Sequence, residues 1–309
     1  MRILHVENMA GIPRILAEAQ TSLGHESHVL ETWKFPADYP HDFEAYYTGR
    51  VFTDLGLMRK VVRIARAHDV VHIHGGMHRK RLDLLVAAMM RPAVVHYHGS
   101  DARMGYGLHY KWLAKKKVVS RPDLLRFVPN AEYVPNPVRP QQITFDMSRT
   151  PTIIHMANDR VTKGTNLITA TIEDLRKEGI KFEFVLMEKR PYAEASAALA
   201  KAHVLIDQVI DEAKIGIAGV IGMTTLEAMA MGKAAVCSVN SELLAKYYPG
   251  IPVVPVAPDK EALKSALRKM IGDMSDTKRL GEAGAEYVRA NHDPVAIAKR
   301  FVAMYESIM

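Results

Sequence analysis

Cysteine and long apolar runs are almost absent from this 309-residue chain. The one cysteine, Cys237, excludes an internal disulfide and favours a reducing compartment. No apolar stretch approaches the roughly 20 residues that a membrane-spanning helix needs. The first residues enter an apolar segment without the basic lead and cleavage site of a signal peptide. We therefore expect a cytoplasmic protein and leave open its attachment to the inner face of a membrane.

Three sequence patterns are also absent, and each absence excludes or disfavours a class of protein. The turn over residues 7–13, which contains Gly11, lacks the Gly-x-Gly-x-x-Gly spacing of dinucleotide-binding dehydrogenases. Short-period repeats and low-complexity segments are missing, which argues against a solenoid or a disordered chain. Basic residues are not interleaved with aromatic ones, so we expect no nucleic acid partner.

The net charge of +7 is unevenly distributed along the chain. Residues 1–145 contain 20 Lys and Arg against 13 Asp and Glu, whereas residues 146–309 contain 21 of each kind. The excess favours an anionic partner for the N-terminal half, such as a phosphorylated acceptor or a membrane surface. Basic segments at 59–60, 79–81 and 111–117 could form such a surface, although solvated helix faces explain such runs equally well.

Strand-like apolar runs alternate with helical patterns along the whole chain, which predicts α/β architecture. We expect strands at residues 3–6, 27–30, 70–74, 93–97, 117–119, 152–156, 182–186, 204–207, 234–238 and 252–256. Helices are expected between them, including 13–23, 55–67, 82–90, 166–177, 192–200 and 224–231. A proline-rich stretch at 134–140 cannot be helical and precedes a linker near residue 150. This pattern therefore predicts two doubly wound, Rossmann-like domains that face each other across a cleft. We expect the domain boundary between residues 145 and 146.

A glycine-rich turn runs from Gly216 to Gly222 and leads into the expected helix around Glu227. Exposed glycine backbone and unpaired amides at a helix start would suit a diphosphate, at Gly222, Met223, Thr224 and Thr225. The structural alternative is a capping box with Thr224 as the N-cap and Glu227 three residues later, closed by Gly232. Both interpretations can hold together.

Two cations and a glycine follow the strand expected at 152–156. Arg160, Lys163 and Gly164 at the carboxyl end of a strand could neutralise a leaving diphosphate. Solvated loop charges are the alternative.

Histidines occur in pairs on two expected strands. Alternation places His72 with His74, and His96 with His98, on common strand faces, as in some metal sites. No carboxylate stands at ligand spacing beside them, so we predict no metal site. His98 precedes a glycine turn that leads to Asp101 and Arg103, so it is the histidine best placed for a role in a binding site.

Several motifs in this order resemble the GT4 family of retaining glycosyltransferases, also called glycosyltransferase group 1. They are RILHV at 2–6, GHESHVL at 24–30, VVHIHGG at 70–76, HYHGSD at 96–101, VPNP at 134–137, KGT at 163–165 and LEAMAMGK at 226–233. The resemblance covers essentially the whole chain.

The resemblance implies a GT-B fold, no essential metal or cofactor, and a UDP- or GDP-linked sugar bound by the second domain. Lys163 and Arg160 would hold the diphosphate, Glu227 the ribose, and His98 the transferred sugar. Gly11, Gly164 and the start of the 224–231 helix would complete the donor site, while Asp101 and Arg103 would face the acceptor. A helix over 294–309 would return to complete the first domain, leaving 146–293 as the second.

One position departs from the family pattern. The family commonly has two glutamates seven residues apart, and Gly219 stands where the first would contact the donor sugar. This leaves three alternatives beside a glycosyltransferase that modifies a glycan, a lipid-linked acceptor or a small molecule. They are a non-catalytic nucleotide-sugar-binding protein, a nucleotide-sugar epimerase, and a protein that binds membranes or polyanions.

Overall fold

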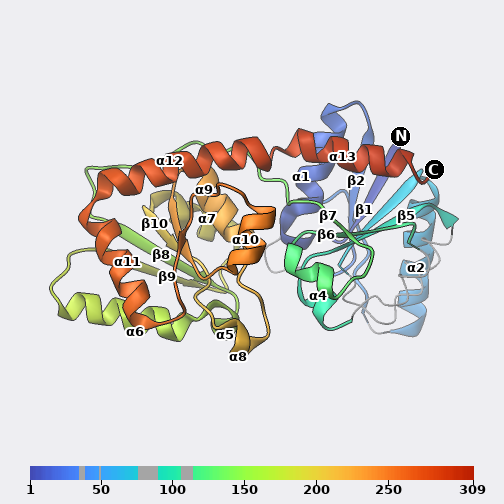
Figure 1. The fold of residues 1–309 in the computed structure, drawn as a ribbon. Coiled ribbons are helices and arrows are strands. Elements are labelled where there is room, and N and C mark those ends of the chain that lie inside the picture. Colours follow the sequence, from blue (N-terminus) through green and yellow to red (C-terminus); the bar gives the residue numbers. More distant parts are fainter. Residues whose placement is uncertain (35–38, 49, 76–89, 106–113) are drawn as a thin grey trace. The chain divides into compact units, whose positions relative to one another are not determined.

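The structure is a computed structural model that describes residues 1–34, 39–48, 50–75, 90–105 and 114–309. The chain divides into two compact units. Unit 1 comprises Met1–Pro137 together with His292–Met309, and unit 2 comprises Val138–Asn291. Each unit contains a parallel β-sheet with helices packed against it (Figure 1). The chain is therefore an α/β protein with two parallel sheets.

The sheet of unit 1 has the strand order β3-β2-β1-β4-β5-β6-β7. Its strands are β1 (Arg2–Val6), β2 (Glu26–Glu31), β3 (Phe43–Glu44), β4 (Val70–His74), β5 (Ala93–Tyr97), β6 (Lys116–Val119) and β7 (Glu132–Tyr133). Strands β4 and β5 are buried along their whole length, as their valine-rich runs predict for central strands of a parallel sheet. The order reverses between the neighbours β1 and β4, and ligands bind beside such switch points at the carboxyl ends of the strands.

The described helices of unit 1 come from both ends of the sequence. They are α1 (Ile12–Ser22), α2 (Val51–Arg66), α4 (Ser100–Arg103), α13 (Pro294–Glu306), and the 3₁₀ helices η1 (Met9–Gly11) and η3 (Pro122–Arg126). Helix α13 packs against α1, and Phe301 and Tyr305 are fully buried (Figure 1). The Asp293 carboxylate caps α13 by accepting a hydrogen bond from the backbone N–H of Ala296 at 2.7 Å.

The sheet of unit 2 has the order β12-β11-β10-β8-β9. Its strands are β8 (Thr152–Ala157), β9 (Glu183–Glu188), β10 (Val204–Ile206), β11 (Ala234–Cys237) and β12 (Val254–Pro255). The described helices are α5 (Arg160–Lys163), α6 (Thr165–Lys177), α7 (Tyr192–Lys201), α8 (Glu212–Ile215), α9 (Met223–Ala230), α10 (Ser241–Tyr247), α11 (Lys260–Gly272) and α12 (Met274–Asn291). The loops that follow β8 and β10 meet at the carboxyl end of the sheet, where the order again reverses.

Some sequence-based expectations fall outside the described residues. These are most of the helix expected at 82–90, the basic segment 79–81, and residues 111–113 of the basic run. Among the described helices, none combines the length and the apolar character needed to cross a membrane.

Candidate functional site

The glycine-rich turn of unit 2 leads into α9, where Gly222 is the N-cap and no side chain caps the helix. The first bond of the helix runs from the Leu226 N–H to the Gly222 carbonyl at 3.2 Å. The amides of the residues between them therefore have no partner within the helix. With the positive end of the helix dipole, these amides form a site suited to an anion.

The capping box expected at the start of this helix is wrong. The Thr225 hydroxyl donates to the buried Asp207 carboxylate at 2.7 Å, and the Glu227 carboxylate accepts from the Tyr192 hydroxyl at 3.2 Å. Both side chains are held by tertiary partners, which local sequence cannot reveal, and Thr224 lies inside the helix. The expected helix stop is correct, because Gly232 has a φ of 75° and its N–H donates to the Met229 carbonyl at 2.8 Å.

Asp207, directly after β10, organises the carboxyl end of this sheet. Its side chain is 1% exposed and accepts hydrogen bonds from the Lys163 ammonium and the Thr225 hydroxyl. Burial alone would raise the pKa of Asp207, but the Lys163 charge and these two hydrogen bonds outweigh burial and lower it. The carboxylate is therefore ionised and holds the lysine beside the first turn of α9. Its position at the end of a strand was the only sequence signal for this role.

The two predicted cations of the loop after β8 have different partners. Lys163 contacts Asp207, whereas Nη1 of Arg160 donates to both carboxylate oxygens of Glu188 on β9, with both N···O distances 2.8 Å. Arg160 also donates to the Asn166 side chain. The structure thus brings Lys163, but not Arg160, to the carboxylate that also holds α9.

Gly164 permits this loop to lie close to the chain that follows β10. Its φ is +70°, and a Cβ atom there would lie 1.9 Å from the Val209 carbonyl oxygen. The Val209 N–H donates to the Lys163 carbonyl at 3.2 Å. Only glycine fits both the conformation and the contact, so Gly164 fixes the position of Lys163.

Glu227 lies on α9 beside Tyr192, the first residue of α7. The pKa of Glu227 is raised to about 7, because burial and, to a smaller extent, the nearby Asp207 charge raise it more than the Tyr192 hydrogen bond lowers it. Burial and the adjacent carboxylate also raise the pKa of Tyr192. Sequence reasoning placed Tyr192 at a helix start but did not predict its contact with Glu227.

A cavity of about 440 Å³ opens beside the glycine-rich turn. Its lining includes Ile210, Gly219, Ser238, Asn240 and Val256. A Cβ atom at Gly219 would lie 2.6 Å from the Ser238 carbonyl oxygen and 3.0 Å from the Val239 Cα atom. A glutamate therefore cannot replace Gly219 unless the backbone moves.

His98 of unit 1 follows β5 and is partly buried. Its Nε2 atom lies 3.1 Å from Nδ1 of His74, and its Nδ1 atom is buried without a hydrogen-bond partner in the described part of the chain. Burial lowers the pKa of His98 to about 4, although Asp101 opposes this shift, so the ring is neutral at pH 7. The Asp101 carboxylate accepts backbone hydrogen bonds from His98, Gly99 and Ala102, which fixes the turn after β5.

Arg103 and Gly11, also predicted site residues, both have structural contacts in unit 1. Arg103 donates to the fully buried Asp123 carboxylate at 2.6 Å, and Arg121 pairs with the same carboxylate. Gly11 has a φ of +70°, and a Cβ atom there would lie 2.9 Å from the Tyr39 ring. Predicted site residues thus occur in both units, and those of unit 2, apart from Arg160, converge on Asp207 and α9.

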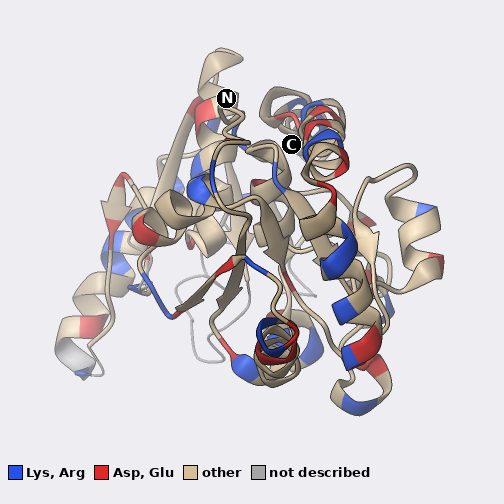
Figure 2. Ribbon diagram, turned by 90° about the vertical axis from the view of Figure 1, so that its left-hand side faces the viewer, with Lys and Arg blue, Asp and Glu red and all other residues tan. Residues whose placement is uncertain are grey.

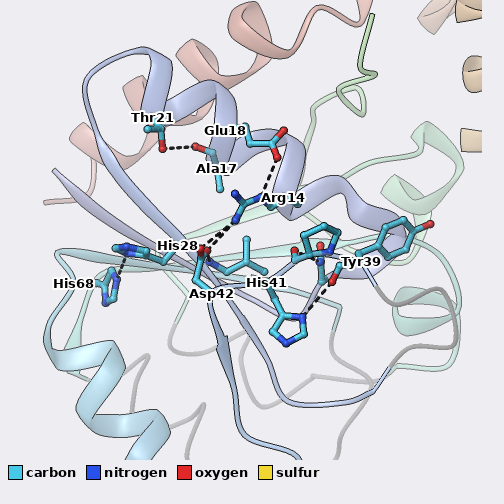
Figure 3. Close-up of polar contacts among 12 residues, drawn as sticks. Arg14, Ala17, Glu18, Thr21, His28, Tyr39, His41, Asp42 and His68 are labelled. Atoms are coloured by element: carbon cyan, nitrogen blue, oxygen red, sulfur yellow. Dashed lines mark hydrogen bonds and ion pairs between the residues drawn. The ribbon is translucent and has the colours of Figure 1, made fainter. Parts of the chain in front are cut away.

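Part of the basic excess of the N-terminal half lies on α2, which carries Arg59, Lys60, Arg63 and Arg66 against Asp54, and part at the start of β6. Figure 2 shows Lys and Arg segments interspersed with Asp and Glu segments along individual helices. Arg14, for example, pairs with Glu18 and with Asp42 (Figure 3).

Comparison with known proteins identifies the fold. No family model matches the sequence, and no curated protein matches it significantly. An α-glucosyltransferase in complex with UDP-glucose and DNA containing an abasic site matches with a TM-score of 0.74 at 12% identity, over 99% of each chain. Anabaena HepE in complex with UDP-glucose matches with a TM-score of 0.71 at 14% identity, over 99% of this chain and all of that one.

A third match has a different activity. UDP-GlcNAc 2-epimerase from Neisseria meningitidis bound to UDP-GlcNAc has a TM-score of 0.60 at 12% identity, over 99% of this chain and all of that one. The same fold therefore occurs in proteins with different chemistry. The chain has the fold of solved nucleotide-sugar glycosyltransferases, with two parallel α/β sheets, in agreement with the expected GT-B class.

Proposed function

We propose that this chain is a retaining glycosyltransferase that transfers a sugar from a UDP- or GDP-linked donor to an acceptor. The proposal rests on the network of Lys163, Asp207 and Thr225, which joins a cation to the open first turn of α9. A diphosphate needs both a positive charge and convergent N–H donors, and this network offers them together.

In the proposed donor complex, the diphosphate binds the amides at the start of α9 and the Lys163 ammonium. Glu227 accepts hydrogen bonds from the ribose, and the cavity beside Gly219 receives the base. Arg160 adds positive charge at the rim of the site once it leaves Glu188.

The proposed reaction breaks the bond between the anomeric carbon and the leaving phosphate oxygen. The acceptor hydroxyl attacks from the same face, and its proton passes to the departing phosphate. Lys163 and the α9 amides stabilise the negative charge that develops on this phosphate. Because the phosphate itself serves as the base, the step needs no protein carboxylate in that role.

Lys163→Ala tests this assignment. We expect loss of measurable sugar transfer and weaker nucleotide binding, because the cation at the diphosphate is removed. Lys260→Ala is the matched control, since Lys260 pairs with Asp174 on the partly exposed α6–α11 surface. Equal turnover in the Lys163→Ala variant and the unaltered protein would contradict the proposal.

The donor class can be identified by thermal unfolding in the presence of UDP-, GDP- and ADP-sugars. A ligand at 100 times its Kd stabilises the native state by roughly 2.7 kcal/mol, so the correct donor raises the Tm measurably. Donor binding without transfer to any acceptor would favour a non-catalytic binding protein, the alternative that Gly219 motivates.

A nucleotide-sugar epimerase is the second candidate, because an epimerase shares the fold. Such an enzyme converts the nucleotide sugar when no acceptor is present. Incubation of donor alone, followed by analysis of the sugar, distinguishes the two reactions. A new epimer would favour this candidate over a transferase.

A further inference from the structure

Five histidine rings gather on three neighbouring strands of unit 1 and form what we call the histidine cluster. They are His5 on β1, His72 and His74 on β4, and His96 and His98 on and after β5. The parallel register sets His5 opposite His72 and His74 opposite His96. Ring centroids of adjacent members lie 4.0 to 5.4 Å apart.

Hydrogen bonds connect three of these rings in a chain that ends at Gln20. His98 Nε2 lies 3.1 Å from His74 Nδ1, His74 Nε2 lies 2.9 Å from His5 Nδ1, and His5 Nε2 lies 2.8 Å from Gln20 Oε1. The amide oxygen can only accept, so we assign the proton of each ring to Nε2. His98 then donates to His74, His74 to His5, and His5 to Gln20.

Several ring nitrogens of the histidine cluster have no hydrogen-bond partner among the residues that the structure describes. Both ring nitrogens of His96 and the Nδ1 atom of His98 are buried and have no hydrogen-bond partner among the described residues. His96 is fully buried. An unpaired buried polar atom costs about 1 to 3 kcal/mol, so an unidentified ligand is a reasonable explanation for their retention.

We propose that His74, His96 and His98 bind one Zn²⁺ ion. The three side chains each offer a ligand nitrogen, and these nitrogens lie within 4.8 Å of one another. The separation of His74 Nδ1 and His98 Nε2, 3.1 Å, is close to the roughly 3.3 Å between two nitrogens of a tetrahedral zinc with bonds of about 2.0 Å. Coordination then requires the His96 ring to move until one of its nitrogens, now within 4.8 Å of the other two, reaches bonding distance.

The remaining members of the cluster would orient the ligands. When the ion replaces the hydrogen bond between His74 and His98, the His98 proton moves from Nε2 to the unpartnered Nδ1 atom, so the ring stays neutral. His74 keeps its Nε2 proton and its hydrogen bond to His5, which in turn donates to Gln20. Such outer hydrogen bonds commonly fix the tautomer and the ring orientation of metal-binding imidazoles.

A second triad, His5, His72 and His74, also satisfies the distance criterion. Most of its nitrogens are already engaged, because His72 Nδ1 bonds the Tyr305 hydroxyl at 2.6 Å and both His5 nitrogens belong to the chain, which leaves only His72 Nε2 without a partner among the described residues. All three rings are fully buried, whereas His98 is partly exposed at the end of its strand. The triad with His96 and His98 therefore differs in containing a ring with both nitrogens unpartnered, His96, and an entry route at His98.

The zinc proposal goes beyond sugar transfer and departs from the expected absence of a metal. Three histidines leave one coordination position for water or an anion.

Titration of the tag-free, chelator-treated chain with Zn²⁺ tests the proposal in the absence of nucleotide. Calorimetry should give one equivalent of tight binding, and Co²⁺ should give the visible absorption of a tetrahedral site. His96→Gln should weaken binding at least about 10-fold, because it removes one of three ligands. Failure of sugar transfer would not affect this result.

His68→Gln is the matched control. The pair formed by His28 and His68 has the same type of contact, 3.0 Å between ring nitrogens, but belongs to neither triad (Figure 3). Unchanged affinity in His68→Gln, together with a loss in His96→Gln, supports the site. If His96→Gln does not fold, as judged by circular dichroism, His98→Gln at the end of β5 takes its place. No stoichiometric binding, or equal affinity in the ligand variant and the unaltered chain, would overturn the proposal.

Discussion

Among single residues, Glu227 couples the stability of unit 2 to pH. Its pKa is about 7 in the folded chain, against 4.5 for an exposed glutamate. The folded state therefore favours the protonated carboxyl group. Preferential protonation of the folded state stabilises unit 2 in full below pH 4.5, and this stabilisation is lost as the pH rises through 7. The loss in the free energy of unfolding is roughly 3 kcal/mol at most.

Glu227→Gln should remove this pH dependence, because the amide has the shape of the protonated acid and does not titrate. We expect the unaltered chain to lose roughly 2 kcal/mol more of its unfolding free energy than the variant between pH 5 and pH 8. Urea unfolding at the two pH values measures the difference. If the free energy of unfolding falls equally in both proteins between the two pH values, Glu227 is ionised at neutral pH and the prediction is wrong.

Gly164 gives a second prediction at this scale. Gly164→Ala combines an unfavourable φ with a Cβ atom 1.9 Å from the Val209 carbonyl oxygen, so it should cost more than about 3 kcal/mol. Gly179→Ala is the control, since Gly179 also has a positive φ, of +79°, but nothing within 4 Å of the added atom. The control should cost only about 1 kcal/mol. Equal losses in urea unfolding would mean that the close contact is unimportant.

The residues of the site differ in how far sequence could identify them. Lys163 was predictable, because a cation beside a glycine at the end of a strand is a local pattern. Its partner Asp207 and the contact between Tyr192 and Glu227 were not, since they depend on how β8, β10, α7 and α9 pack. Alternation likewise placed the histidines on shared strand faces, but only the register of β4 with β5 brings the pairs together.

Among the elements, α13 contributes five buried residues to unit 1. Phe301 is fully buried, and its ring centroid lies 4.9 Å from that of His72 and 5.4 Å from that of His96. Phe301→Ala should therefore cost about 3 to 5 kcal/mol. Val295→Ala on the exposed side of the same helix should cost less than about 1 kcal/mol. Similar losses for both variants in urea unfolding would contradict this role of the α13 face.

Sequence predicted the central elements better than the edges. The runs at 70–74 and 93–97 are observed as β4 and β5, because buried parallel strands have continuous apolar sequences. The two-residue strands β3 and β7 were missed, since edge strands this short depend on pairing with a neighbour. Helix α9 begins at Met223, one residue before the expected range of 224–231. Its N-cap is Gly222 and not Thr224.

At the scale of the whole molecule, the alternation of strand-like and helical patterns predicted two α/β domains, and resemblance predicted the GT-B class. Neither contained the information that distinguishes a transferase from an epimerase, because both activities occur on this fold. That difference depends on a few contacts to the sugar, and Gly219 stands at the position where the family commonly makes one of them.

The return of α13 to unit 1 has a consequence for folding during synthesis. Unit 1 begins with β1 but obtains Phe301 and Tyr305 only after all of unit 2 has been translated. Unit 2 is continuous in sequence and can form its core as soon as it leaves the ribosome. The first unit to be translated is therefore the second to be completed, and until then the surface of α1 that α13 covers is exposed to chaperones and proteases.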